Sequence, residues 1–240
     1  MVDHLGNLRR DRALLAALAG SDLTRPVDAC PGWSLHDLLA HLATVHRFAV
    51  AMMATPPEAE LSRPTVRAPE GESIWEFLDL GLDGLIADVG LRNLDDACLS
   101  FVGPVTVGWW LRRQSLETTV HRWDAELAAG RQPSLIDAAT AIDGIDEWLD
   151  LLPRRGFAPP ETLRGTLHLH ATDDDGEWFI EIANPVTWRR GHEKGDVAVR
   201  GSCEQLYLAC WGRVAPASLE VIGGDGLFTA FLDSIGAPPR

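Results

Sequence analysis

The sequence predicts an α+β protein in which an N-terminal antiparallel four-helix bundle precedes a small α+β domain. Two observations predict this fold class. Long segments with apolar residues at helical spacing, separated by Pro-rich and Gly-rich breaks, fill the first part of the chain. From residue 161 the pattern changes to short alternating strands around a tight turn. We therefore expect one domain over residues 1–153 and a second over residues 154–240.

The first two helices are expected at residues 3–19 and 35–54. Leucines recur at helical spacing in the first segment. Ser34 precedes the second segment and Asp37 follows three residues later, which resembles a capping box with Asp in place of Glu. The stretch 55–70 then carries four prolines, too many for a regular element, and is predicted to be a long loop.

Three further helices complete the predicted helical part. Apolar residues recur at helical spacing from Ile74 to Ile86. A long helix is expected at residues 106–129, because this run has no Pro and ends at a Gly. Another is expected at residues 134–151, closed by Pro153.

The second part reads as short mixed elements. The segments LRGTLHLHAT and EWFIEIA flank an acidic turn, DDDG, which predicts a hairpin. VAVRG is another strand candidate, CEQLYLACWGR has a helical pattern, and SLEVIGG is expected as a final strand before a terminal helix. Such a mixture indicates an α+β domain.

Composition narrows the classes of function. The net charge of −14 repels phosphate backbones, so nucleic acid is not an expected partner. No apolar run approaches the roughly 20 residues that span a bilayer, and the charged N-terminus does not resemble a secretory signal. We expect a cytoplasmic protein without a membrane partner. The four cysteines form no C-x-x-C pair and are expected to be free thiols.

A candidate metal centre comes from two helical segments. Glu117 and His121 are four residues apart, so both side chains can face one ion from one side of a helix. This spacing alone is weak evidence for a metal site, because a Glu and a His joined by a surface hydrogen bond have the same spacing. His41 lies within an apolar helical run, where its imidazole needs a partner, either a metal or a group on a neighbouring helix.

Other polar and aromatic side chains lie close to these three residues in the sequence. His36 and His46 are each five residues from His41, roughly 140° around a helix, and are expected to be solvated or capping residues. Asp124 lies one turn beyond His121 and either supports a metal ligand or caps charge on the helix surface. Trp33, among other tryptophans near these segments, is expected to belong to the core rather than to a substrate platform.

The segment CPGWSLHDLLAHLATVH resembles the second-helix motif of the mycothiol-dependent maleylpyruvate isomerase family, which is itself similar to DinB-like metal-binding bundles. The segment LETTVHRWDAELAAG resembles the fourth-helix motif of that family, and the second half is similar to its sterol-carrier-like C-terminal domain. The resemblance implies zinc, or another divalent metal, on His41, Glu117 and His121. It also implies mycothiol as a cofactor and Arg213 as the group that holds a substrate carboxylate.

The resemblance leaves three functions open. In the isomerase, a metal-activated thiolate adds to maleylpyruvate and is eliminated again after cis-trans rotation. In a mycothiol S-transferase, the thiolate would remain attached to an electrophilic small molecule in detoxification or secondary metabolism. In a non-catalytic protein, the C-terminal domain would bind a lipid or another small molecule. The sequence does not indicate the oligomeric state.

Overall fold

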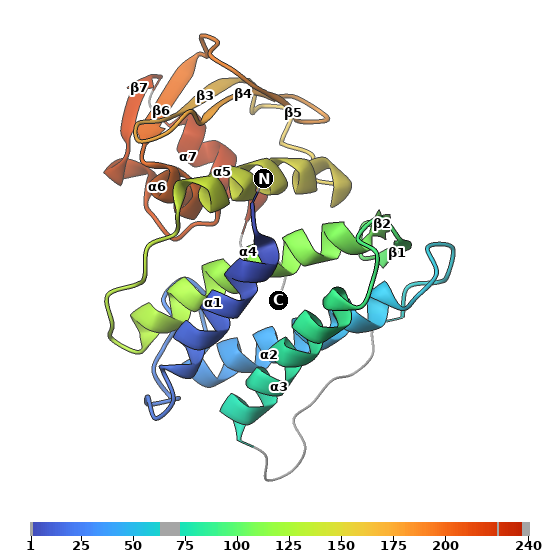
Figure 1. Cartoon of the computed structure of the whole chain (residues 1–240). Coiled ribbons are helices and arrows are strands. Elements are labelled where there is room, and N and C mark those ends of the chain that lie inside the picture. The colour runs from blue at the N-terminus through green and yellow to red at the C-terminus, as the bar shows by residue number, and fades with distance from the viewer. Residues whose placement is uncertain (1, 63–72, 225, 237–240) are drawn as a thin grey trace. The chain divides into compact units, whose positions relative to one another are not determined.

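The computed structural model describes residues 2–62, 73–224 and 226–236. The chain divides into two compact units, one up to Ser134 and one from Leu135 onward. The first unit is helical with one small hairpin, and the second combines helices with a five-stranded sheet (Figure 1). This arrangement is the α+β fold that the sequence predicts.

The first unit consists of four helices and a two-stranded hairpin. Its elements are α1 (His4–Ala16), α2 (Leu35–Met53), α3 (Ile74–Gly90), β1 (Ala97–Ser100), β2 (Gly103–Thr106) and α4 (Val107–Ala128). The α2 helix packs against α3 and α4, and α1 packs against α3 and α4. All four helices were expected. The observed α2 starts at the expected residue and ends one residue earlier than expected, and α4 is one residue shorter at each end.

Local hydrogen bonds explain where α2 begins. The Ser34 backbone N–H donates to Asp37 Oδ2 over 2.9 Å, and the Asp37 N–H donates to Ser34 Oγ over 3.3 Å. These two bonds form the expected capping box. The leucines that follow lie on the inner side of α2, and Leu35, Leu38, Leu39 and Leu42 are fully buried. The start and the orientation of α2 are therefore both set by its first two turns.

The second unit begins with α5 and continues into the sheet. Its helices are α5 (Ala138–Arg154), α6 (Cys203–Cys210) and α7 (Leu227–Ile235), with a short 3-10 turn at Pro216–Ser218. Its strands are β3 (Gly165–Ala171), β4 (Glu177–Ile182), β5 (Thr187–Arg190), β6 (Val197–Gly201) and β7 (Glu220–Gly223). They lie in the order β5-β4-β3-β6-β7, and only the β3–β6 pair is parallel. The helices lie along one face of this sheet (Figure 1).

The expected domain boundary at residue 153 differs from the division after Ser134. The helix α5 lies with the second unit because it packs against α6. A Cβ at Gly144 of α5 would lie 2.3 Å from the Tyr207 ring of α6, so glycine is what allows this close approach. Pro153 lies inside the last turn of α5 instead of ending the helix before it.

Two short elements were not expected. The β1–β2 hairpin precedes α4, and β5 is a four-residue edge strand with mostly exposed side chains. The predicted loop at residues 55–70 lies partly outside the described residues, which end at 62 and resume at 73. The described helices include none with both the length and the apolar character needed to cross a membrane. All four cysteines are free thiols, as expected.

Candidate metal centre

The candidate centre lies between α2 and α4. His41 is in the second turn of α2, and Glu117 and His121 are one turn apart on α4. Both helices begin at a side-chain cap, Ser34 for α2 and Thr106 for α4, whose oxygen accepts from the Trp109 N–H. Because the helices pack against each other, the three predicted ligands face a common point.

The structure brings these three side chains within reach of one ion. One ligand atom from each of His41, Glu117 and His121 lies within 4.8 Å of the other two. His41 Nε2 is 3.0 Å and His121 Nε2 is 3.4 Å from the same oxygen, Glu117 Oε1. The exposed fraction falls from 25% for the His41 side chain to 16% for Glu117 and 9% for His121. The group is therefore nearly enclosed and reachable from the His41 side.

Asp124 orients His121. The His121 Nδ1 donates to Asp124 Oδ2 over 3.0 Å, and the Asp124 side chain is fully buried. A carboxylate on one ring nitrogen fixes the tautomer and leaves the other nitrogen free to act as a ligand. Of the two roles considered for Asp124, the geometry favours support of His121.

Arg113 holds the other side of Glu117. Its Nη2 donates to Glu117 Oε2 from one turn earlier on α4, and the Arg113 side chain is only 5% exposed. Glu117 therefore presents Oε1 to the histidines while Oε2 is engaged by a cation. The sequence reasoning missed Arg113, although its spacing of four residues before Glu117 is a signal that the two share a helix face.

The protonation state of His41 suits metal binding. Burial, followed by the nearby His121 and Arg113, lowers the pKa of His41 to about 3. The imidazole is therefore neutral near pH 7, which is the form that binds metals. Trp33 packs beside it, with ring centroids 5.0 Å apart, so one of the tryptophans expected in the core lies against the centre.

A tight loop brings Cys30 to the edge of the same cluster. Cys30, His121 and Asp124 each offer an atom within 4.8 Å of the others. The loop is held by backbone bonds of 2.9 Å from Val27 N to Trp33 O, from Cys30 N to Val27 O and from Trp33 N to Cys30 O. The sequence indicated Cys30 only as a free thiol, and its position just before α2 was the available signal of a place beside the centre.

The two remaining histidines of α2 differ from each other. His36 is more than half exposed, as expected. The expectation for His46 was wrong, because His46 is fully buried and its Nε2 lies 2.9 Å from Thr118 Oγ1 on α4. Thr118 donates its own proton to the Gln114 carbonyl, so it accepts from His46. An inward-facing threonine on α4 thus accepts from Nε2 of a histidine that was expected in solvent, while among the described residues the buried His46 Nδ1 has no hydrogen-bond partner.

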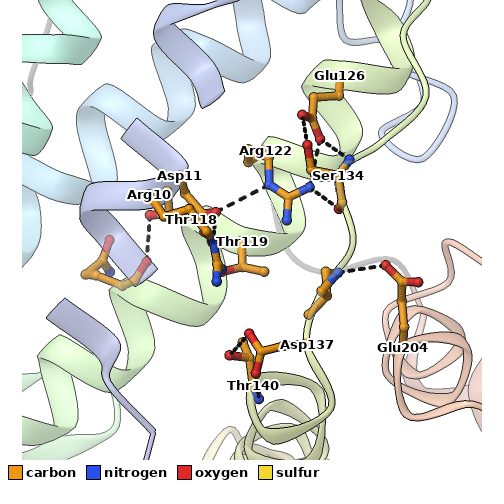
Figure 2. Close-up of polar contacts among 12 residues, drawn as sticks. Arg10, Asp11, Thr118, Thr119, Arg122, Glu126, Ser134, Asp137, Thr140 and Glu204 are labelled. Atoms are coloured by element: carbon orange, nitrogen blue, oxygen red, sulfur yellow. Dashed lines mark hydrogen bonds and ion pairs between the residues drawn. The ribbon is translucent and has the colours of Figure 1, made fainter. Parts of the chain in front are cut away.

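A buried ion-pair network connects α4 to α1 and to Ser134 (Figure 2). The fully buried Arg122 donates to Glu126 and to the Ser134 carbonyl, over 2.7 and 2.6 Å. Its Nε lies 3.4 Å from Asp11 Oδ1 of α1, and Asp11 also accepts from Thr119 over 2.6 Å. This network fixes the rotation of α4 next to His121.

Arg213, the predicted carboxylate-binding residue, belongs to the second unit. It follows Gly212, which has a φ of 75° after the end of α6. Its Nη1 donates to the Trp211 carbonyl over 2.6 Å.

Comparison with known proteins identifies the family. The model of the mycothiol maleylpyruvate isomerase N-terminal domain matches residues 7–126, and the model of the C-terminal domain of these isomerases matches residues 139–230. None of the curated proteins matches the chain at a significant level.

Two solved structures share the fold. One is the mycothiol-dependent maleylpyruvate isomerase, at 17% identity and a TM-score of 0.55. The other is a histidine-to-alanine mutant of the mycothiol-dependent maleylpyruvate isomerase, at 14% identity and a TM-score of 0.62. In both cases 91% of each chain is covered. With both domain models matched in order along most of its length, the chain belongs to the mycothiol-dependent maleylpyruvate isomerase family.

Proposed function

We propose that this protein is a mycothiol-dependent isomerase of the maleylpyruvate type with a catalytic divalent metal, zinc by preference, on His41, Glu117 and His121. The convergence of three ligand atoms within 4.8 Å carries the proposal. Two imidazoles and one carboxylate fit zinc among the common intracellular ions. Three protein ligands leave at least one position open, as in catalytic rather than structural zinc sites.

The side chains of the chain have separate tasks in this proposal. Neutral His41 and His121 supply nitrogen ligands, and Glu117 supplies a negative charge through Oε1. Arg113 keeps the carboxylate of Glu117 aligned, and Asp124 holds the His121 ring. When bound, zinc and mycothiol would supply a thiolate at neutral pH, whose reversible addition to a conjugated cis double bond allows rotation to the trans isomer.

Arg213 is proposed to bind a carboxylate of the substrate. An anionic diacid needs a cationic partner in a chain with a net charge of −14. Replacement by Lys keeps the charge but loses the two-pronged geometry, so Arg213→Lys is expected to raise KM more than it lowers kcat. An unchanged KM in both Arg213→Lys and Arg213→Ala would remove Arg213 from this role.

The activity is tested by incubating zinc-loaded protein with mycothiol and either maleylpyruvate or a chlorinated arene. Products are followed by mass spectrometry. Return of unmodified mycothiol together with the trans product, fumarylpyruvate, supports the isomerase. Accumulation of a thioether of mycothiol instead identifies an S-transferase, which would use the same metal ligands.

Variants connect the activity to the centre. His41→Ala and His121→Ala are expected to lose most of the bound metal and nearly all turnover while the helices stay formed. His36→Ala is the matched control, because His36 is on the same helix and exposed. Full zinc occupancy in both ligand variants would refute the assignment of the centre. Full turnover in chelator-treated protein would refute the need for a metal.

A further inference from the structure

Four potential metal ligands gather on one face of the sheet in the second unit. On β3, His168 and His170 are two residues apart, so both side chains point to the same face. In the β3–β4 register, His170 lies opposite Glu177, which places Glu177 on that face too. The neighbouring Trp178 faces the other way, where its Nε1 donates to Asp146 of α5 over 2.8 Å. The cluster is therefore on the sheet face that α5 does not cover.

The loop after β5 adds a third histidine. The Gly191 N–H donates to the Glu177 carbonyl over 3.1 Å, which places the next residue, His192, beside the Glu177 side chain. One ligand atom from each of His168, His170, Glu177 and His192 lies within 4.8 Å of the other three. His170 Nδ1 and His192 Nδ1 are 2.6 and 3.1 Å from the same oxygen, Glu177 Oε1.

The fourth member, His168, is buried without a hydrogen bond on its inward nitrogen. The residue is 6% exposed, and among the described residues its Nε2 has no hydrogen-bond partner. The closest carboxylate oxygen, Glu177 Oε2, is 3.8 Å away, too far for a hydrogen bond. The loop after β5 also runs close to the β3 backbone, since a Cβ on Gly195 would lie 2.9 Å from the His168 backbone nitrogen. Burying a nitrogen acceptor without a partner is costly, so a bound group between this nitrogen and the three other ligands would stabilise the site.

We propose that His168, His170, Glu177 and His192 form a second metal site, separate from the centre on α2 and α4, for a first-row divalent metal of the zinc class. Three imidazoles and one carboxylate favour such ions over magnesium or calcium, which prefer oxygen ligands. An ion among the four groups would satisfy His168 Nε2 and offset the charge of Glu177.

The number of ligands indicates a structural role for this site. Four protein ligands complete a tetrahedral shell, whereas a catalytic zinc keeps one position open. The ligands come from β3, β4 and the loop after β5, so an ion would tie the exposed edge of the sheet to its centre. The inference does not depend on the proposed function, because none of these residues belongs to the centre on α2 and α4.

The test counts zinc on the full-length protein after dialysis, by elemental mass spectrometry. Wild type is expected to hold about two zinc ions per chain, and His41→Ala/His121→Ala about one. A His170→Ala/His192→Ala variant should also hold about one, and the combined four-residue variant none. Circular dichroism verifies that each variant is folded.

Cobalt substitution reports the geometry of the second site. In the His41→Ala/His121→Ala background, Co²⁺ should give intense visible bands typical of four-coordinate cobalt, and His192→Ala should abolish them. His36→Ala serves as the control for adventitious binding at an exposed histidine. A wild type that holds one zinc and keeps it in His170→Ala/His192→Ala would overturn the second site while leaving the first intact. Loss of zinc only in the second-site variants would instead refute the centre on α2 and α4.

Discussion

Asp124 is the residue on which the orientation of His121 depends. It is fully buried and accepts from His121 Nδ1 over 3.0 Å. We predict that Asp124→Asn weakens zinc binding about 10–100-fold, because the amide is a poorer acceptor and no longer fixes the tautomer. Competition with a chromophoric chelator measures the change. Asp28→Asn, in the exposed loop before α2, is the control, and equal affinities in the two variants would exclude this role for Asp124.

His46 is a buried histidine that is not one of the proposed metal ligands, so substituting it tests the effect of burial on its protonation. Burial, followed by electrostatic interactions with His41, Arg47 and His121, lowers the pKa of His46 to about 3. Between about pH 6.5 and pH 3 the unfolded chain therefore binds more protons at this residue, so stability is lost as the pH falls through that range.

Chelator-treated protein should therefore lose about 2 kcal/mol of unfolding free energy from this residue between neutral pH and about pH 5. His46→Gln keeps a donor for Thr118 and removes the titration, so its urea-unfolding curves should depend less on pH. The exposed His36→Gln should behave like wild type. If His46→Gln and wild type show the same pH dependence, His46 is not held neutral by burial.

Some residues of the candidate centre could be predicted from the sequence and others could not. His41, Glu117 and His121 were named because their types and spacing suit a metal, and the structure places them together. Arg113 and Cys30 contribute through contacts made only after folding. The second cluster was missed because its four residues are joined by strand register and a loop crossing, neither of which is visible in a linear pattern.

At the level of elements, the ion pairs of Arg122 connect α4 to α1. Arg122 and Asp11 are both fully buried, and Arg122 also pairs with Glu126 (Figure 2). Removing one partner of a buried pair leaves an uncompensated charge, so we predict that Arg122→Met costs about 3–5 kcal/mol in urea unfolding. Arg9→Met is the control, because Arg9 is exposed on α1. A cost below about 1 kcal/mol would indicate that the network is not a major support of α4.

Elements with strong local signals were predicted well, and elements set by tertiary pairing were not. The helices α2 and α4 have N-terminal capping residues and long segments without proline, so their bounds were predicted to within one residue. The hairpin β1–β2 and the edge strand β5 have four residues per strand, too few to show a period. Pro153 was expected to end α5, but the helix continues one residue past it, to Arg154.

At the level of the whole molecule, the change from long helices to short strands correctly indicated two parts. The position of α5 could not be read from that change, because it depends on the contact between Gly144 and Tyr207. A helical pattern looks the same whichever partner it packs against. The division after Ser134 thus follows packing rather than secondary structure.

If each unit binds a metal as proposed, zinc is expected to stabilise the two units separately. A metal that binds only the folded state adds about 2.7 kcal/mol when its free concentration is 100 times Kd. We predict that zinc raises the melting temperature of both units relative to chelator-treated protein, measured by calorimetry. His41→Ala should cancel the shift for the first unit, and His192→Ala the shift for the second. Magnesium, which prefers oxygen ligands, should produce neither shift. A single zinc-induced shift that survives both substitutions would contradict the ligand sets, because the stabilising ion would then bind elsewhere.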